Sequence, residues 1–327
     1  MLKSIILYAI ISFFILIIFS KISYIFNLVD MPNKRKKHLK PTAFTGGLII
    51  SFIYIASIFI FEINSEKLNL TLSFAFLITI VGFIDDKYNL NFYTKLSLQI
   101  IPIIYLIFLE NFNLIDIGEY NYFKLELNNF AIPFTLLSIL FLINAFNYFD
   151  GSDGTLALTT ISVLCILYFL SNDENDKLFL IIIFLPLLLF LFFNFSTFKL
   201  PKLFLGDSGS LLLGFVISFT LIYFANYKSI HPILLAWSIA IIVFEFLSLN
   251  IIRLKNNKNL FLPGNDHLHY ILLKNTKSLF QTNLFIFLAN IIFFIIGYMS
   301  FIFISPLISL ILFISLFLIY LTLRKKF

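Results

Sequence analysis

The 327-residue sequence has few charged side chains, one cysteine and one tryptophan. Charged residues make up 12% of it, whereas a soluble globular domain carries about 25%. This shortage excludes an ordinary cytosolic enzyme, a nucleic-acid-binding protein and a disordered chain. The lone cysteine, Cys165, excludes a disulfide framework and a metal site built from several cysteines. Walker A, GxGxxG and GxSxG motifs are also missing, so nothing supports ATP hydrolysis or serine acyl transfer.

Long hydrophobic runs are what the sequence has in excess. Hydrophobic residues make up 60% of it, and the mean hydropathy is +1.00. A helix needs about 20 mostly apolar residues to cross a bilayer. We therefore predict an all-α polytopic integral membrane protein with a single transmembrane domain, residues 1–327. The eleven predicted spans are 4–20, 44–61, 70–84, 96–109, 130–148, 155–170, 178–193, 205–224, 232–252, 282–299 and 303–322.

The distribution of basic residues predicts the orientation in the membrane. Of the 23 Lys and Arg residues, 18 fall in alternate loops, beginning with 21–43, or in the C-terminal segment. The other five fall on the opposite side. Because cytoplasmic loops carry an excess of Lys and Arg, we expect the N-terminus outside and the C-terminus in the cytoplasm.

Acidic residues at the cytoplasmic ends of the spans form a second pattern. An Asp at the centre of a membrane helix costs about 2.5–3.5 kcal/mol, and less toward the interface. Several carboxylates on one side therefore predict a shared polar cavity that opens to the cytoplasm. Seven lie at or near these ends, and an eighth, Glu245, lies within a span; the seven are Asp30, Asp85, Asp86, Asp150, Asp153, Asp207 and Asp266.

Two adjacent carboxylates, Asp85 and Asp86, end one span in the segment GFIDDK at 82–87. Neighbouring anions raise each other's pKa unless a cation lies beside them. A divalent metal or a lysine would serve as that cation. A solvated helix end is the alternative interpretation of this segment taken alone.

The segment NAFNYFDGSDG at 144–154 places short polar residues at the end of another span. Asn144, Asn147 and Asp150 recur every three residues and share one face if the helix continues to its end. Glycines on both sides of Asp153 allow a tight turn into the next span. Such a segment suits metal or nucleotide oxygens. An ordinary turn explains the Gly and Asp residues but not the apolar-flanked Asn pair.

Asp207 lies in the segment GDSGS, which opens a further span. An anion is favoured at a helix N-terminus and caps it well, so simple capping and ligand binding are both open interpretations. Ser210 and Gly214 form a small-residue face that allows close helix packing.

Two cytoplasmic loops carry basic residues and histidines. The first could be an anionic-lipid patch, but its junction with Pro, Thr and a glycine pair also suits a substrate site. In the last loop, His267 and His269 can face one ligand together only in an extended or turn conformation. We therefore favour phosphate or nucleotide contacts over a helical zinc pair. The first-loop candidates are Lys34, Arg35, His38 and Thr42.

Taken in order, five cytoplasmic segments resemble the polyprenyl-phosphate N-acetylhexosamine-1-phosphate transferases, the MraY- and WecA-like enzymes of glycosyltransferase family 4. The resemblance covers nearly the whole chain and the same eleven-span layout, and it is nearer to the WecA-type branch. The segments are VDMPNKRKKHLKPTAFTGG at 29–47, GFIDDK at 82–87, NAFNYFDGSDGTLA at 144–157, FLGDSGSLLLG at 204–214 and NDHLHY at 265–270.

The resemblance implies residue roles. Asp85 and Asp86 match the family's catalytic Asp-Asp pair, and Asp207 matches its Mg²⁺ ligand. His267 and His269 match an HxHH motif whose last position is Tyr270 here, and Glu245 stands where WecA-type members have Asp. The family's NxxDGxD motif, at the nucleotide and metal site, is matched by Asn147 (substrate and metal), Asp150 and Asp153 (catalytic).

The resemblance also implies the reaction and the partners. A sugar 1-phosphate, such as GlcNAc 1-phosphate, would pass from a UDP-sugar to polyprenyl (undecaprenyl) phosphate, releasing UMP and starting a cell-envelope polysaccharide. Both reactants are anions, so the site needs Mg²⁺, or alternatively Mn²⁺, with Lys or Arg. We expect the bacterial inner (plasma) membrane, with the site facing the cytoplasm; a homodimer stays open.

Two alternatives remain. A muramoyl-pentapeptide substrate of the MraY type is disfavoured by the first loop and the paired histidines. A secondary transporter would place its acidic residues at the midplane, often within inverted repeats. Here the polar motifs lie at one face, and no repeat is visible.

Overall fold

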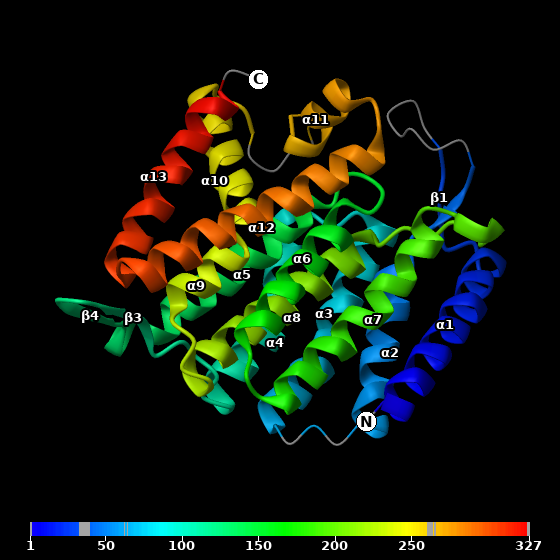
Figure 1. Cartoon of the computed structure of the whole chain (residues 1–327). Coiled ribbons are helices and arrows are strands. Elements are labelled where there is room, and N and C mark those ends of the chain that lie inside the picture. The colour runs from blue at the N-terminus through cyan, green and yellow to red at the C-terminus, as the bar shows by residue number, and fades with distance from the viewer. Residues whose placement is uncertain are drawn as a thin grey trace.

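The computed structural model describes residues 2–32, 40–61, 63, 65–259, 264 and 266–325, and this part of the chain is mostly helical (Figure 1). Two short antiparallel strand pairs, β1–β2 and β3–β4, complete it. The helices are α1 (Leu2–Ile25), α2 (Gly46–Ile60), α3 (Glu66–Tyr88), α4 (Phe92–Ile104), α5 (Ala131–Phe149), α6 (Thr155–Leu170), α7 (Glu174–Asn194), α8 (Gly206–Tyr227), α9 (Pro232–Ser238), α10 (Ala240–Lys255), α11 (Leu268–Thr276), α12 (Leu279–Phe303) and α13 (Pro306–Arg324). The strands are β1 (Val29–Asp30), β2 (Thr42–Ala43), β3 (Asp116–Tyr120) and β4 (Phe123–Glu126). A π-helical segment, η1 (Tyr105–Leu109), continues α4, and two short 3₁₀ helices are η2 (Asn128–Phe130) and η3 (Thr197–Lys199).

Eight helices of the described chain are long and apolar enough to cross a membrane. A ninth span results if α9 and α10, which are bent by 74° at their junction, form one broken helix. Helices α2 and α6 are apolar but shorter, at 15 and 16 residues. Each of the eleven predicted segments coincides with one of these helices or helix pairs. The short helix α11 was not expected, because its segment is polar. The chain is a multi-pass, all-helical membrane protein.

Helix α8 lies at the centre of the bundle (Figure 1), and 94% of its 18-residue apolar stretch is buried. Helices α2, α3 and α5 pack around it at glycines. A Cβ on Gly47 would collide with the backbone of Gly209, and a Cβ on Gly82 would lie 2.5 Å from the Ser208 Cα. Close approach of backbones is how membrane helices gain packing contacts where lipid is as apolar as the core. Gly47 and Gly82 therefore allow the N-terminal end of α2 and the C-terminal end of α3 to lie against the N-terminal end of α8.

Helices α9, α10, α12 and α13 form a second group around Trp237. The Trp237 Nε1 donates to the Ser309 Oγ of α13 at 3.0 Å, and the indole packs against Gly297 of α12. Helix α13 is otherwise little buried, since its only two buried residues are Ser309 and Arg324.

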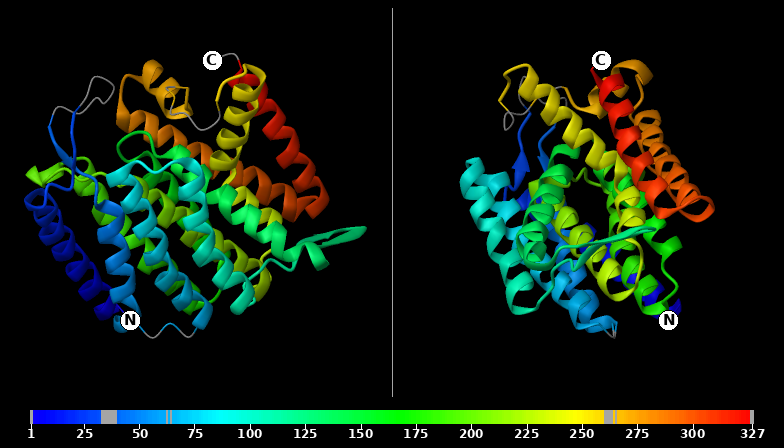
Figure 2. Two further views of the ribbon diagram at one scale, coloured as in Figure 1. Left: turned by 180° about the vertical axis from the view of Figure 1, so that it is seen from behind. Right: turned by 90° about the vertical axis from the view of Figure 1, so that its left-hand side faces the viewer.

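The two ends of the molecule differ in what they carry. The N- and C-termini lie at opposite ends (Figure 1), as an odd number of spans requires. The β1–β2 pair and α11 lie at the end that holds the C-terminus. The β3–β4 hairpin extends beyond the helices at one side (Figure 2).

Candidate functional site

The N-terminus of α8 is capped by Asp86, at the C-terminal end of α3. Its Oδ1 accepts a hydrogen bond from the Asp207 N–H at 2.9 Å, and its Oδ2 accepts one from the Ser208 N–H at 3.1 Å. These amides have no partner within their own helix, and the helix dipole favours an anion beside them. Gly206, at φ +74°, permits the approach, because a Cβ there would lie 2.6 Å from the Asp86 Oδ2. The capping interpretation of Asp207 is therefore wrong, since another carboxylate caps this helix.

The Asp207 carboxylate instead forms an ion pair with Lys95. The Lys95 Nζ of α4 lies 2.6 Å from the Asp207 Oδ2 and 2.6 Å from the Asp85 Oδ2. Asp207 is also the more accessible carboxylate, with 37% of its side chain exposed against 10% for Asp85. The lysine is the cation that adjacent carboxylates require, but sequence reasoning counted it only as a topogenic charge. Its position ten residues after Asp85, at the start of the next helix, was the signal.

Asn147 of α5 joins this cluster. Its Nδ2 lies 2.9 Å from the Asp207 Oδ1 and 2.8 Å from the Ser210 Oγ. The expected shared face reaches Asn147 but not Asp150. Asn144 and Asn147 both lie within α5, where Asn144 donates to the Leu140 carbonyl. Helix α5 ends at Phe149, and Asp150 leaves the helical path with ψ 82°.

The turn after α5 carries Asp150 and Asp153. The Lys202 Nζ pairs with Asp153 at 2.6 Å. The Asp150 carboxylate has no hydrogen bond or ion pair within the described residues. Packing around it, together with the nearby Asp207 and Asp86 carboxylates, raises the pKa of Asp150 well above its usual value. Asp150 is thus prone to hold a proton.

Helix α12 fixes the same turn through Asn283, which sequence reasoning missed. Its Nδ2 donates to the Asp153 carbonyl at 2.8 Å, and its Oδ1 accepts from the Thr155 Oγ1 at 2.7 Å. Gly154 has φ +76°, a conformation that glycine adopts without strain, as the turn prediction required. An amide beside Thr282, near the beginning of an apolar span, was the available signal.

The two histidines of the last loop lie against this turn. His267 is extended and precedes α11, while His269 lies in its first turn. Their rings are nearly parallel, with centroids 5.5 Å apart and an interplanar angle of 18°. A Cβ on Gly151 would collide with the His269 imidazole, and the Tyr270 hydroxyl donates to the Gly151 carbonyl at 2.8 Å. The tyrosine that replaces the family's last histidine therefore joins the two motifs.

Both imidazoles are buried, at 9% exposure for His267 and 2% for His269. The His267 Nδ1 and the His269 Nε2 have no hydrogen-bond partner in the described part of the chain. Burial lowers the pKa of His267, and it lowers that of His269 to about 3. At neutral pH these rings therefore offer uncharged hydrogen-bonding nitrogens rather than positive charge.

The first-loop candidates are only partly visible. Lys34, Arg35 and His38 lie outside the described residues. Thr42 is buried in β2, where its hydroxyl donates to the Lys40 carbonyl at 3.1 Å. The chain that follows runs beside the entry to α8, since the Phe204 N–H donates to the Ala43 carbonyl at 2.8 Å. The end of this loop is thus fixed next to Asp207.

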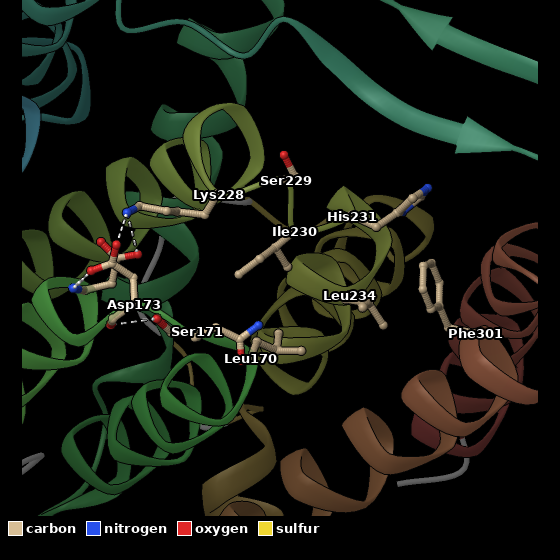
Figure 3. Close-up of a pocket in the computed structure, with 11 residues that line it drawn as sticks. Leu170, Ser171, Asp173, Lys228, Ser229, Ile230, His231, Leu234 and Phe301 are labelled. Atoms are coloured by element: carbon tan, nitrogen blue, oxygen red, sulfur yellow. Dashed lines mark hydrogen bonds and ion pairs between the residues drawn. The ribbon is translucent and has the colours of Figure 1, made fainter.

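A hollow of about 340 Å³ contains none of the motif residues (Figure 3). It lies beyond the C-terminal end of α8, where the Lys228 Nζ pairs with Asp173 at 3.0 Å. Helix α8 spans about 1.5 Å per residue, so its length separates this hollow from Asp207. His231 at its edge caps α9, accepting from the Ile233 N–H at 3.2 Å and donating to the Glu119 carbonyl at 2.9 Å. The two ring nitrogens of this histidine therefore have a structural role.

The carboxylates of Asp85, Asp86 and Asp207 form an acidic cluster that offers oxygen ligands. These ligands suit a magnesium ion that the protein shares with a substrate phosphate better than one enclosed by protein ligands alone. No group of three or more His, Cys, Asp or Glu residues in the described chain is arranged to hold a metal alone. Mg²⁺ usually takes one or two protein carboxylates and completes its shell with water and substrate phosphate. The accessible Asp207 carboxylate, which lies beside the Asn147 amide, matches that demand.

The chain is similar to proteins that are already known. The family described as glycosyl transferase family 4 matches residues 68–225, which include both aspartate motifs and Asp207. An undecaprenyl-phosphate alpha-N-acetylglucosaminyl 1-phosphate transferase of Pasteurella multocida is 30% identical, over 80% of this chain and 76% of its own. The Yersinia pestis protein of that name is 26% identical, over 92% of this chain and 85% of its own.

A third relative is a probable undecaprenyl-phosphate N-acetylglucosaminyl 1-phosphate transferase of Bacillus subtilis. It is 28% identical, over 81% of this chain and 75% of its own. The similarity thus extends over most of the length of each protein and includes the loops that form the acidic cluster. The chain belongs to glycosyl transferase family 4.

Proposed function

We propose that the protein transfers an N-acetylhexosamine 1-phosphate, such as GlcNAc 1-phosphate, from a UDP-sugar to undecaprenyl phosphate and releases UMP. The observation that carries the proposal is the ion-pair cluster in which Lys95 bridges Asp85 and Asp207 at the ends of membrane helices. A water-soluble nucleotide and a lipid phosphate can meet only at such a boundary. The names of the relatives support the same donor and acceptor.

The aspartates divide the work. Asp86 has both oxygens engaged by backbone amides of α8, so it positions the helix that carries Asp207. Asp85 faces Lys95 and can receive a proton from the lipid phosphate. Asp150, with its raised pKa and no partner among the described residues, is the group suited to hold a proton toward the diphosphate. Asp153 and Lys202 shape the turn beneath it.

Asp207 and Asn147 are the residues that would hold Mg²⁺, or alternatively Mn²⁺. The metal would neutralise the diphosphate and stabilise the charge that develops on the leaving UMP. Lys95 supplies a second cation at the same carboxylates. His267 and His269 supply uncharged hydrogen-bonding nitrogens to the donor, and Lys34, Arg35, His38 and Thr42 are proposed substrate contacts from the first loop.

We also propose eleven spans, an outer N-terminus and a site that faces the cytoplasm of a bacterial cell. The opposite placement of the two termini and the 18-to-5 split of basic residues support this topology. Cysteines placed at Asn91 and Asn172, both exposed, test it in a chain without Cys165. Position 91 should react only from the cytoplasm and position 172 only from outside; labelling of both from the same side contradicts the topology.

UMP release by the purified full chain in detergent tests the reaction. UDP-GlcNAc, UDP-GalNAc and UDP-MurNAc-pentapeptide are each supplied with and without undecaprenyl phosphate and Mg²⁺. We expect UMP from an N-acetylhexosamine donor only when lipid and metal are both present. Release from the pentapeptide donor alone would point to an MraY-type enzyme, and no release from any donor contradicts the proposed reaction.

A further inference from the structure

The last helix of the chain buries a positive charge beside the histidine loop. Arg324, the final residue of α13, is 7% exposed, although α13 otherwise buries only Ser309. Its guanidinium meets Glu245 of α10, which is 3% exposed. The Arg324 Nε donates to the Glu245 Oε2 at 3.0 Å, and its Nη2 donates to the Oε1 at 3.0 Å. This is the planar two-point pairing that arginine makes and lysine cannot.

The same ion pair holds the backbone on both sides of His267. The Arg324 Nη2 also donates to the Asp266 carbonyl. The Glu245 Oε1 accepts from the Leu268 N–H at 2.8 Å. Since these two backbone groups flank His267, its position is set by residues of α10 and α13 rather than by the loop itself.

A second arginine fixes the residue before the histidine. The Arg253 Nε donates to the Asp266 Oδ2 at 3.0 Å, and its Nη2 donates to the Oδ1 at 2.7 Å. This pair lowers the pKa of Asp266 to about 2. The Tyr320 hydroxyl, one turn before Arg324, donates to the Glu245 Oε2 at 2.8 Å. Each carboxylate oxygen of Glu245 and Asp266 therefore accepts at least one hydrogen bond.

Stability alone is a weak reason for such an arrangement. Removing two charges from water costs several kcal/mol per ion, and an apolar pair of equal volume is often as stable. The ion pair fixes the direction of the Asp266 carbonyl and the Leu268 N–H, on either side of His267. An apolar pair could not do this, because it has no hydrogen-bonding groups.

We propose that Arg324 and Glu245 are positioning residues that hold His267 and His269 against the turn at Gly151, so that the C-terminal helix sets the affinity for the nucleotide-sugar. The inference rests on the proposed function, because the histidines are taken as donor contacts. Few contacts connect the ion pair to the turn. The pair is hydrogen-bonded to the backbone of residues 266 and 268, and the next residue, His269, packs on Gly151. No contact between Arg324 and substrate is required.

The test compares Arg324→Lys and Glu245→Gln with the wild type in the full chain. Arg324→Lys keeps the charge but loses the two-point geometry, and Glu245→Gln keeps an acceptor for Leu268 but loses the charge. We expect the KM for the UDP-sugar to rise about tenfold in each, with the KM for undecaprenyl phosphate unchanged. Loss of folded protein would lower the apparent kcat and leave both KM values in place. The exposed neighbour substitution Lys325→Gln is the matched control.

A double-mutant cycle with His269→Ala tests whether Arg324 acts on donor affinity through this histidine. If Arg324 acts through this histidine, Arg324→Lys should add little to the donor KM once His269 is gone. A wild-type donor KM in Arg324→Lys, or full additivity with His269→Ala, overturns the inference. Should the wild type release no UMP, the proposed reaction fails separately. The rise in Tm caused by UDP-GlcNAc then decides the positioning role, and an equal rise in wild type and Arg324→Lys overturns it.

Discussion

The Asp86 carboxylate accepts the backbone N–H of Asp207 at 2.9 Å, so one aspartate of the site fixes the helix that carries another. The side chain of Asp207 is thereby free to face Lys95 and Asn147. Two carboxylates that look equivalent in the sequence thus have different tasks. One orients α8, and the other meets the cation.

Loss of this cap should destabilise the protein. We expect Asp86→Ala to lower the free energy of unfolding by about 1–2 kcal/mol, because two amides at the start of α8 lose their acceptor. Asp86→Asn keeps one acceptor and should cost less. Thermal unfolding in detergent measures this, with the exposed Lys87→Gln as the control. An Asp86→Ala variant as stable as Lys87→Gln would show that α8 needs no cap.

The contact between Gly151 and His269 predicts a rescue. A methyl group at position 151 would collide with the imidazole, so Gly151→Ala should displace the histidine loop and raise the KM for the UDP-sugar. Removing the imidazole in Gly151→Ala/His269→Ala should restore the Tm that the single glycine substitution lost. If the double variant is no more stable than Gly151→Ala, the collision is not the cause.

Acid should destabilise the protein through His269. Its pKa is about 3 in the folded chain and about 6.5 unfolded, so between these values the unfolded state binds more protons. The stability contribution is therefore complete above about pH 6.5 and is lost as the pH falls toward 3. His269→Asn should show a flatter decline of Tm across this range than the wild type. Parallel declines of the two proteins would mean that the histidine is not buried uncharged.

How far the sequence predicts this architecture depends on the kind of interaction. Apolar length alone located the helices, because crossing a bilayer demands it. Carboxylates at span ends marked side chains that the fold brings together, since Asp85 and Asp207 both meet Lys95. The spacing of Asn144, Asn147 and Asp150 predicted one face for all three, but such a face lasts only while the helix continues, and α5 ends before Asp150. Local pattern does not reveal where a helix stops.

The residues that sequence reasoning missed act across long separations. Lys95 meets Asp207 from 112 positions away, and Arg324 meets Glu245 from 79. A charge count treats these side chains as topology signals, since Lys and Arg at span ends have that role in any membrane protein. Only the fold shows which of them turn inward. Asn283 was missed because its partner, the Asp153 carbonyl, lies 130 positions away.

Neutralising Lys95 should make the site more dependent on a divalent cation. Lys95→Gln leaves Asp85 and Asp207 facing each other without their shared ammonium group, so Mg²⁺ should bind there more strongly. We expect added Mg²⁺ to raise the Tm of Lys95→Gln more than that of the wild type. Lys87→Gln serves as the control for a lost surface charge. Equal Mg²⁺ effects in all three proteins would place the metal away from these carboxylates.

The Asp207→Asn variant gives the most direct test of the account. Because Asp86 caps α8, replacing Asp207 by a residue of equal size should leave the Tm close to the wild-type value. UMP release from UDP-GlcNAc should fall by about two to three orders of magnitude, as when a group that stabilises transition-state charge is removed. Higher Mg²⁺ should restore little of it. Near-normal UMP release by a well-folded Asp207→Asn protein would contradict the central claim that Asp207 holds the metal.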